Sequence, residues 1–177
     1  LKNFSYLCSM DLEKTRNIVL KLMRQHGLVG YTFKWDRAVR RFGSCNGRTK
    51  TLTLSRPMTQ HESNDDRVIN TILHEIAHAL DYKKRGYSNH DSQWKKTAKS
   101  IGCNGQTCSS VGGLDQSKIL KWIASCPSCE KQIYYARKSK VSKACGSCCK
   151  KNNNNTFKHA NILPSTDNFT KRLSRIL

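Results

Sequence analysis

The stretch HEIAH at residues 74–78 constrains the fold of this 177-residue chain more than any other feature. His74 and His78 are four residues apart, so on a helix both imidazoles project from one face, one turn from each other. That separation suits two ligands of one metal ion, and Glu75 lies close enough to contact a water on the metal. The stretch therefore predicts a helix that carries part of a catalytic metal site.

A catalytic zinc site usually takes three protein ligands and leaves one position open, so a third ligand must come from elsewhere. Two acids lie in range, but His90 is better placed. Eleven residues separate it from His78, enough for a helix to end at Gly86, turn and start again. The predicted zinc ligands and general base are His74, His78, His90 and Glu75.

The alternative is a core helix that happens to carry two histidines. Ile72, Leu73, Ile76 and Ala77 predict that this helix is buried. An unpaired glutamate and two histidines would be costly in such a core without a metal. This cost favours the zinc site.

A second metal site is predicted by two cysteine pairs, Cys126-x2-Cys129 and Cys145-x2-Cys148. This spacing is typical of a four-cysteine zinc ribbon. A closed thiolate site can fold a short segment that lacks a core of its own. We therefore expect two Zn²⁺ ions, one catalytic and one structural, and note that Cys149 could substitute for Cys148.

The remaining cysteines argue against a secreted disulfide protein. The chain has nine cysteines, an odd number, and we find neither a signal peptide nor a membrane span. Cys103 and Cys108 are expected to be free thiols, and Cys45 to be packed in a hairpin. These features favour an intracellular protein.

The net charge of +20 points to a polyanionic partner, nucleic acid before membrane. Residues 1–60 hold 12 Lys or Arg and 3 Asp or Glu, residues 61–116 hold 7 of each, and residues 117–151 hold 9 and 1. The middle segment has no net charge and both flanking segments are basic. This distribution is what we expect if a reaction centre lies between surfaces that bind a polyanion. The alternative is solubility charge spread over solvated faces.

Aromatic and basic residues interleave in the ribbon segment. Rings flanked by cations suit single-stranded nucleic acid, because bases stack on the rings while cations hold phosphates. Alternatively, at least one ring closes the small core of the ribbon. The candidate nucleic-acid-binding residues are Trp122, Tyr134, Tyr135, Arg137, Lys138, Lys140 and Lys143.

The spacing of apolar residues and the positions of glycines and helix-capping residues predict the elements around these sites. We expect a helix that Ser9 or Asp11 caps and that ends near Gly27, a strand at YTFKW, and a hairpin that turns at Asn46-Gly47. A long helix is predicted over 65–85, capped by Ser63 and stopped by Gly86. Asn89 is expected to cap a further helix that runs to about Ser100.

With these residues in place, the chain resembles the SprT-like zinc metalloproteases, the Spartan-type proteases that degrade proteins crosslinked to DNA. In HEIAHALDY…NHDSQW, as in the family, a third histidine opens the helix after HExxH, and Trp94 follows His90 as an aromatic residue does there. The hairpin RRFGSCNGRTKTLTLS is similar to the family's Gly-x-Cys hairpin that ends in Leu-Ser. CPSC…CGSC matches the family's zinc-ribbon segment, and the resemblance covers about residues 10–150. One departure is Asp91, which stands where Gly is common.

The resemblance implies an α+β fold: a zincin-like helical metalloprotease core with a small β-hairpin or sheet, then a small β zinc-ribbon subdomain. We expect a SprT-like domain at 1–114, the ribbon at 115–151, and an Asn-rich linker and basic tail at 152–177. The implied function is a DNA-dependent zinc metalloendopeptidase acting on proteins bound or crosslinked to DNA. Unpaired DNA and DNA-attached proteins are the expected partners of a monomer located at DNA in a nucleus, nucleoid or viral replication site.

Two other functions stay open at this point. One is a zinc-ribbon nucleic-acid-binding protein whose histidine site is not catalytic, for which Glu75 would have no purpose. The other is a zinc peptidase without DNA dependence, for which the basic surplus and the aromatic ribbon would be unexplained.

Overall fold

The computed structural model describes residues 11–106, 114–138, 144–151 and 162–164. The chain divides into two compact units, Leu1–Leu114 and Asp115–Leu177, which are described separately below. The three-part organisation expected from the sequence stays a prediction. Within the described residues, no helix combines the length and apolar composition that crossing a membrane requires.

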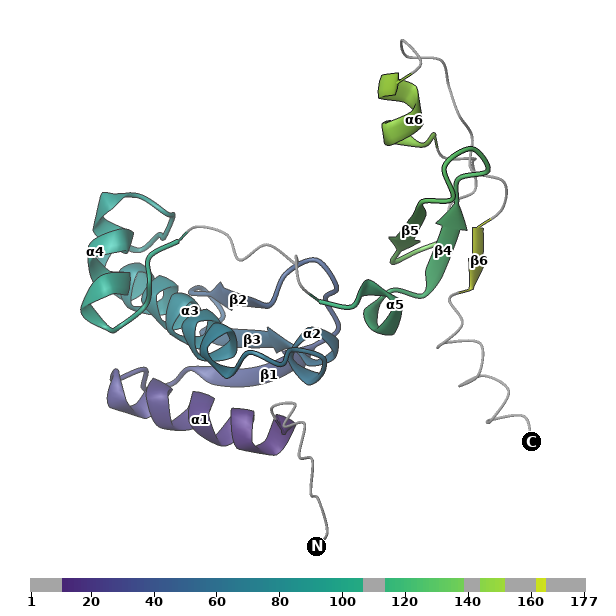
Figure 1. Ribbon diagram of the computed structural model, residues 1–177. Coiled ribbons are helices and arrows are strands. Elements are labelled where there is room, and N and C mark those ends of the chain that lie inside the picture. Colours follow the sequence, from purple (N-terminus) through teal and green to yellow (C-terminus); the bar gives the residue numbers. More distant parts are fainter. Residues whose placement is uncertain (1–10, 107–113, 139–143, 152–161, 165–177) are drawn as a thin grey trace, which may run out of the picture. The chain divides into compact units, whose positions relative to one another are not determined.

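The first unit places four helices around a three-stranded sheet (Figure 1). Its elements are α1 (Leu12–Gln25), β1 (Thr32–Asp36), β2 (Gly43–Asn46), β3 (Thr51–Ser55), α2 (Arg56–Gln60), α3 (Asp65–Arg85) and α4 (Ser92–Ser100). The strand order is β1-β3-β2, with β3 parallel to β1 and antiparallel to β2. Strand β2 therefore lies at the edge of the sheet.

Helix α3 is central because two of its sides are apolar. Ile72 and Ile76 belong to the main buried cluster with Leu52 and Leu54 of β3. On another side, Leu73 and Ala77 pack with residues of α4 in a second buried cluster. The remaining side is left for polar residues, and it carries the histidines.

The ends of α3 and α4 differ slightly from the sequence prediction. Asn64, not Ser63, caps α3 by accepting a hydrogen bond from the Arg67 N–H. Asp91, not Asn89, caps α4. Gly86 ends α3 in a left-handed conformation with φ of 78°, as expected from its position.

The second unit has a small antiparallel sheet in the order β5-β4-β6. Its elements are α5 (Gln116–Ile119), β4 (Trp122–Ser125), β5 (Gln132–Tyr135), α6 (Gly146–Lys151) and β6 (Ile162–Pro164). Strand β6 comes from the segment expected to be a linker and tail, and it pairs with β4. The rest of 152–177 lies outside the described residues.

Together the two units give the mixed α+β fold that the sequence predicts.

Candidate functional site

Three histidines converge at the junction of α3 and α4. His74 and His78 come from successive turns of α3, and His90 directly precedes the residue that caps α4. Their Nε2 atoms form a triangle, with sides of 3.2 Å between His74 and His78 and 3.0 Å from His90 to each of the others. The structure thus brings the three predicted ligands to one point.

The triangle fits a zinc ion. Zn–N bonds of about 2.0–2.1 Å place tetrahedral ligand nitrogens about 3.4 Å apart, close to the separations in this site. Burial lowers the pKa of both His74 and His78 to about 4, so both imidazoles are neutral near pH 7. Neutral lone pairs aimed at a common point repel one another unless a cation lies between them.

The opposite sides of the rings are held by the surrounding chain. His78 Nδ1 lies 2.8 Å from Ser88 Oγ. A hydrogen bond to the Gln106 backbone partly offsets the lowering of the His74 pKa by burial, so His74 donates to the Gln106 carbonyl. A proton on that side leaves Nε2 with its lone pair, which is the form that binds metal.

Trp94 forms a buried floor beneath the three rings. Its side chain is fully buried, and its ring centroid lies 4.7, 5.0 and 4.5 Å from those of His74, His78 and His90. This contact gives a physical reason for the aromatic residue four positions after the third histidine.

An arginine clamp joins the two helices that carry the ligands. Arg85, in the last turn of α3, donates to Asp81 of its own helix and to Asp91 at the start of α4, with Nε–Oδ1 and Nη1–Oδ2 distances of 2.8 Å. Asp81 is buried, and hydrogen bonds from Arg85 lower the pKa of Asp91 to about 2. The clamp therefore fixes the residue next to His90.

The predicted general base lies beside this centre. Glu75 is 6% exposed, and burial raises its pKa to about 8, although nearby Arg41 lowers it. A Cβ atom on Gly43 of β2 would lie 2.8 Å from Glu75 Cγ, so only glycine leaves room for this carboxylate. Cys45 is half-buried in the hairpin, as expected, and burial raises its pKa to about 12.

The centre opens into a cleft of about 1560 Å³ between α3, strand β2 and the turns beside them. All three histidines and Glu75 line it. Tyr82 and Tyr87 also line it, and the Tyr82 ring lies directly on Gly47, where a Cβ atom would come within 2.0 Å of it. Either hydroxyl is thus a candidate to stabilise an oxyanion.

Comparison with known protein families matches residues 13–112 to the SprT-like family. This chain belongs to the SprT-like family. Family membership and the three-histidine group support a zinc metallopeptidase.

No curated protein matches the SprT-like chain. Among solved structures, the crystal structure of the metallopeptidase zymogen of Pyrococcus abyssi abylysin is similar at 16% identity and a TM-score of 0.38, covering 49% of this chain and 87% of that chain. The family match, not this likeness, supports the assignment.

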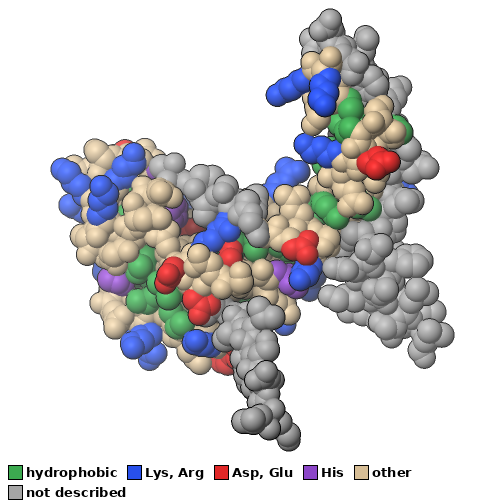
Figure 2. Space-filling view, in the orientation of Figure 1, with side chains coloured by type: hydrophobic (Ala, Val, Ile, Leu, Met, Phe, Trp, Pro, Cys, Tyr) green, Lys and Arg blue, Asp and Glu red, His purple; other side chains and the backbone are tan. Residues whose placement is uncertain are grey.

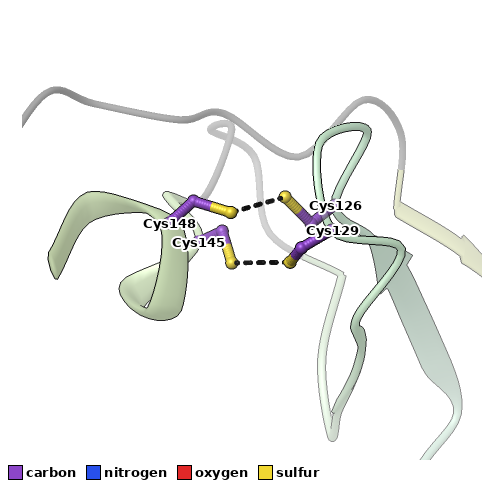
Figure 3. Close-up of side chains that lie close together, drawn as sticks. All are labelled: Cys126, Cys129, Cys145 and Cys148. Carbon is purple, nitrogen blue, oxygen red and sulfur yellow. Dashed lines mark hydrogen bonds between the residues drawn. The ribbon is translucent and has the colours of Figure 1, made fainter. Parts of the chain in front are cut away.

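The SprT-like chain has a second candidate metal centre in its other unit. Cys126 and Cys129 follow β4, and they face Cys145 and Cys148 at the start of α6 (Figure 3). The Sγ atoms lie 3.7 Å apart in both pairs, Cys126–Cys148 and Cys129–Cys145. Zn–S bonds of about 2.3 Å give tetrahedral S···S distances of about 3.8 Å, whereas a disulfide needs about 2.05 Å. The four cysteines therefore fit a zinc ribbon.

The other cysteines that the structure describes are Cys45, Cys103 and Cys149, and none of them belongs to this group. Cys149 is half-buried and is not one of the four converging sulfurs. Cys103 is a buried free thiol. Cys108 lies outside the described residues.

The three aromatic residues predicted to bind nucleic acid fall on two faces of the ribbon sheet. Trp122 and Tyr135 are paired across β4 and β5, so they share one face, where Lys138 Nζ lies 5.6 Å from the Trp122 ring. Burial raises the pKa of Tyr135, and the neighbouring Cys145 raises it further. Tyr134 is on the opposite face, and its hydroxyl donates to Gln132. Arg137 is exposed, whereas Lys140 and Lys143 lie outside the described residues.

Sequence reasoning missed the residues that support the histidines. Ser88, Gln106 and the Arg85 clamp carry no motif. The one available signal was the spacing of Asp81 and Arg85, which are four apart on a helix.

Proposed function

We propose that this chain is a DNA-dependent zinc metalloprotease that hydrolyses peptide bonds in proteins bound or crosslinked to DNA. The observation that carries the proposal is the buried carboxylate of Glu75 beside three converging histidines in an open cleft. A purely structural zinc site has closed ligation and needs no such base.

Zinc bound by His74, His78 and His90 would polarise the scissile carbonyl and lower the pKa of a water. The positive charge of a bound zinc ion would lower the raised pKa of Glu75, so that its carboxylate accepts the proton of the attacking water and returns it to the leaving amine nitrogen. Gly43 keeps that carboxylate against β2, and Trp94 with the Arg85 clamp holds the ligands in place. Tyr82 or Tyr87 donates a hydrogen bond to the developing oxyanion.

The DNA-dependent part of the proposal is supported by charge and by the ribbon. The net charge of +20 comes from 32 Lys and Arg against 12 Asp and Glu, and Figure 2 shows Lys and Arg side chains on the surface of both units. In the ribbon unit, the half-buried Trp122 ring has Lys138 Nζ 5.6 Å from its centroid, and the half-buried Tyr134 ring lies on the opposite face. A ring with nearby cations suits an unpaired base and its phosphates. DNA binding would raise the local concentration of any protein attached to the same strand, so the protease would act at DNA.

The deciding experiment uses a protein crosslinked to an oligonucleotide, incubated with the full chain with and without single-stranded DNA. We expect cleavage that depends on zinc and on DNA, and none with Glu75→Gln. Cleavage that ignores DNA would leave a zinc peptidase without DNA dependence. DNA binding without any cleavage would leave the non-catalytic nucleic-acid-binding protein.

A further inference from the structure

The cations that line the active-site cleft are all arginines. The chain has 12 arginines and 20 lysines, yet the described residues of the cleft wall include four arginines and no lysine. They are Arg40, Arg41, Arg48 and Arg67. Charge serving only solubility would draw on lysine as well, whereas the planar guanidinium suits paired hydrogen bonds to a carboxylate or phosphate.

Within the described residues, two of these arginines form ion pairs and two do not. Arg41 pairs with Asp36 at 2.6 Å, and Arg67 pairs with Glu62 at 3.0 Å. Arg40 and Arg48 are exposed, and no ion pair or hydrogen bond within the described part of the chain involves either side chain. Their guanidinium groups are available to a ligand in the cleft.

Strand β2 lies between these two arginines in the chain. Arg40 comes three residues before Gly43, and Arg48 two residues after Asn46. One edge of β2 pairs with β3, and the other has no strand partner within the described residues. The strand rises about 3.3 Å per residue, so its four residues span roughly 13 Å. Glu75 marks its Gly43 end and Tyr82 lies just past its other end, at Gly47.

We propose that Arg40 and Arg48 select peptide segments that carry acidic residues on both sides of the scissile bond. An extended peptide would pair its backbone with the edge of β2 and meet one arginine near each end. Asp66 and Glu75 are the acids among the described lining residues, and a bound zinc ion would add positive charge, so the cleft attracts anions. A peptide fits better than a DNA strand, because only a peptide uses the backbone groups of β2. This proposal rests on the proposed function, whose active site it specifies.

The test measures peptide binding separately from cleavage. Labelled ten-residue peptides share one central sequence and carry Glu, Gln or Lys on both flanks, and they are titrated by anisotropy against the zinc-loaded Glu75→Gln full chain. We expect the Glu peptide to bind about threefold to tenfold tighter than the Gln peptide, the range for two exposed ion pairs, and the Lys peptide to bind most weakly.

Variants on the same background assign the preference to the two arginines. Arg40→Gln with Arg48→Gln should bring the Glu and Gln peptides to equal affinity, and Arg40→Glu with Arg48→Glu should favour the Lys peptide. The control, Lys14→Gln with Lys21→Gln, removes the same charge from exposed positions on α1 and should keep the preference. Zinc content and thermal unfolding confirm that each variant is folded.

Equal or undetectable binding of all three peptides would overturn the proposal. So would an arginine double variant that loses affinity for single-stranded DNA but keeps the peptide preference, because the arginines would then bind phosphate. Cleavage by the wild-type chain is measured in parallel. If nothing is cleaved while the arginine-dependent preference is present, the proposed function fails and the peptide-binding inference stands.

Discussion

The two candidate metal centres of this chain rest on different supports. His74 and His78 project from α3, whose apolar residues belong to buried clusters that include β3 and α4. In the ribbon unit, Cys126, Cys145 and Cys148 form a buried cluster by themselves. The first centre is therefore mounted on a scaffold that has its own core. Among the described residues of the second unit, the buried cluster consists of the candidate ligands themselves, so a bound metal would take the place of a core. Loss of metal should therefore unfold the second unit but leave the first one folded.

The largest effect is expected from Cys126→Ser. Structural zinc contributes apparent binding free energies of about 10–16 kcal/mol in small zinc-dependent folds, so losing a ligand should unfold the ribbon unit. Zinc content should fall by one ion, while the first unit keeps its thermal transition and its metal. Cys149→Ser is the matched control, because Cys149 lies outside the cluster, and it should change neither. A folded ribbon in Cys126→Ser would break the comparison.

Glu75→Gln should abolish chemistry in the first unit without changing its fold. We expect proteolysis to fall about 10²- to 10⁴-fold, as for a lost general base, with zinc content unchanged because Glu75 is not a predicted ligand. The control is Asp66→Asn, which removes the other acid that lines the cleft. Activity close to wild type in Glu75→Gln would reject the assignment of this residue.

Arg85→Lys tests whether the Arg85 clamp positions the ligands of the histidine site. Lysine keeps the charge beside buried Asp81 but cannot form paired hydrogen bonds to two carboxylates. Outer-sphere changes typically cost 10- to 100-fold in metal affinity, and we expect about tenfold weaker zinc binding at the histidine site. Competition with a chelator of known affinity measures it.

Lys84→Met, an exposed change on the same turn, serves as the control for Arg85→Lys. The ribbon zinc provides an internal reference that should not move in either protein. Equal chelator competition curves for Arg85→Lys and wild type would show that the clamp does not position His90.

The smallest effect separates the two tyrosines of the ribbon. Tyr134→Ala removes a ring from the face away from Tyr135 and should weaken single-strand binding by about 1 kcal/mol, roughly fivefold, with little change for duplex. Tyr135→Ala should instead lower the thermal stability of the ribbon, because its half-buried ring lies near Cys145 of the metal centre. Anisotropy titrations with both oligonucleotides check this, and identical DNA affinities for Tyr134→Ala and wild type would place the contact elsewhere.

Local patterns in the sequence were enough to predict α3, the β2–β3 hairpin and the three-histidine group. Each depends on spacing within one segment or on one short turn. The parallel pairing of β1 with β3 was not predicted. Thr32 and Thr51 lie far apart in the sequence, and no local pattern shows that they pair in the folded chain. The predicted cap of α3 is wrong for a finer reason. Ser63 and Asn64 are adjacent, both residue types can cap a helix, and only the backbone conformation decides between them.

The contacts that hold the histidines in place were the hardest part of the site to predict from the sequence. Asp81 and Arg85 are typical of an exposed pair on a helix, and only the return of α4 brings Asp91 to the same guanidinium. The Gln106 carbonyl acts through the backbone, which no side-chain pattern can reveal. Such contacts depend on how segments meet rather than on what each segment contains.

The position of Trp94 has a consequence for how this protein can be observed. Zinc has a filled d shell and gives no colour of its own, so its arrival at a protein is usually invisible. Here a fully buried indole touches all three imidazoles, and its fluorescence should respond when a cation orders those rings. With Trp35 and Trp122 replaced by phenylalanine, the emission of a single residue would report metal loading in real time and without a label.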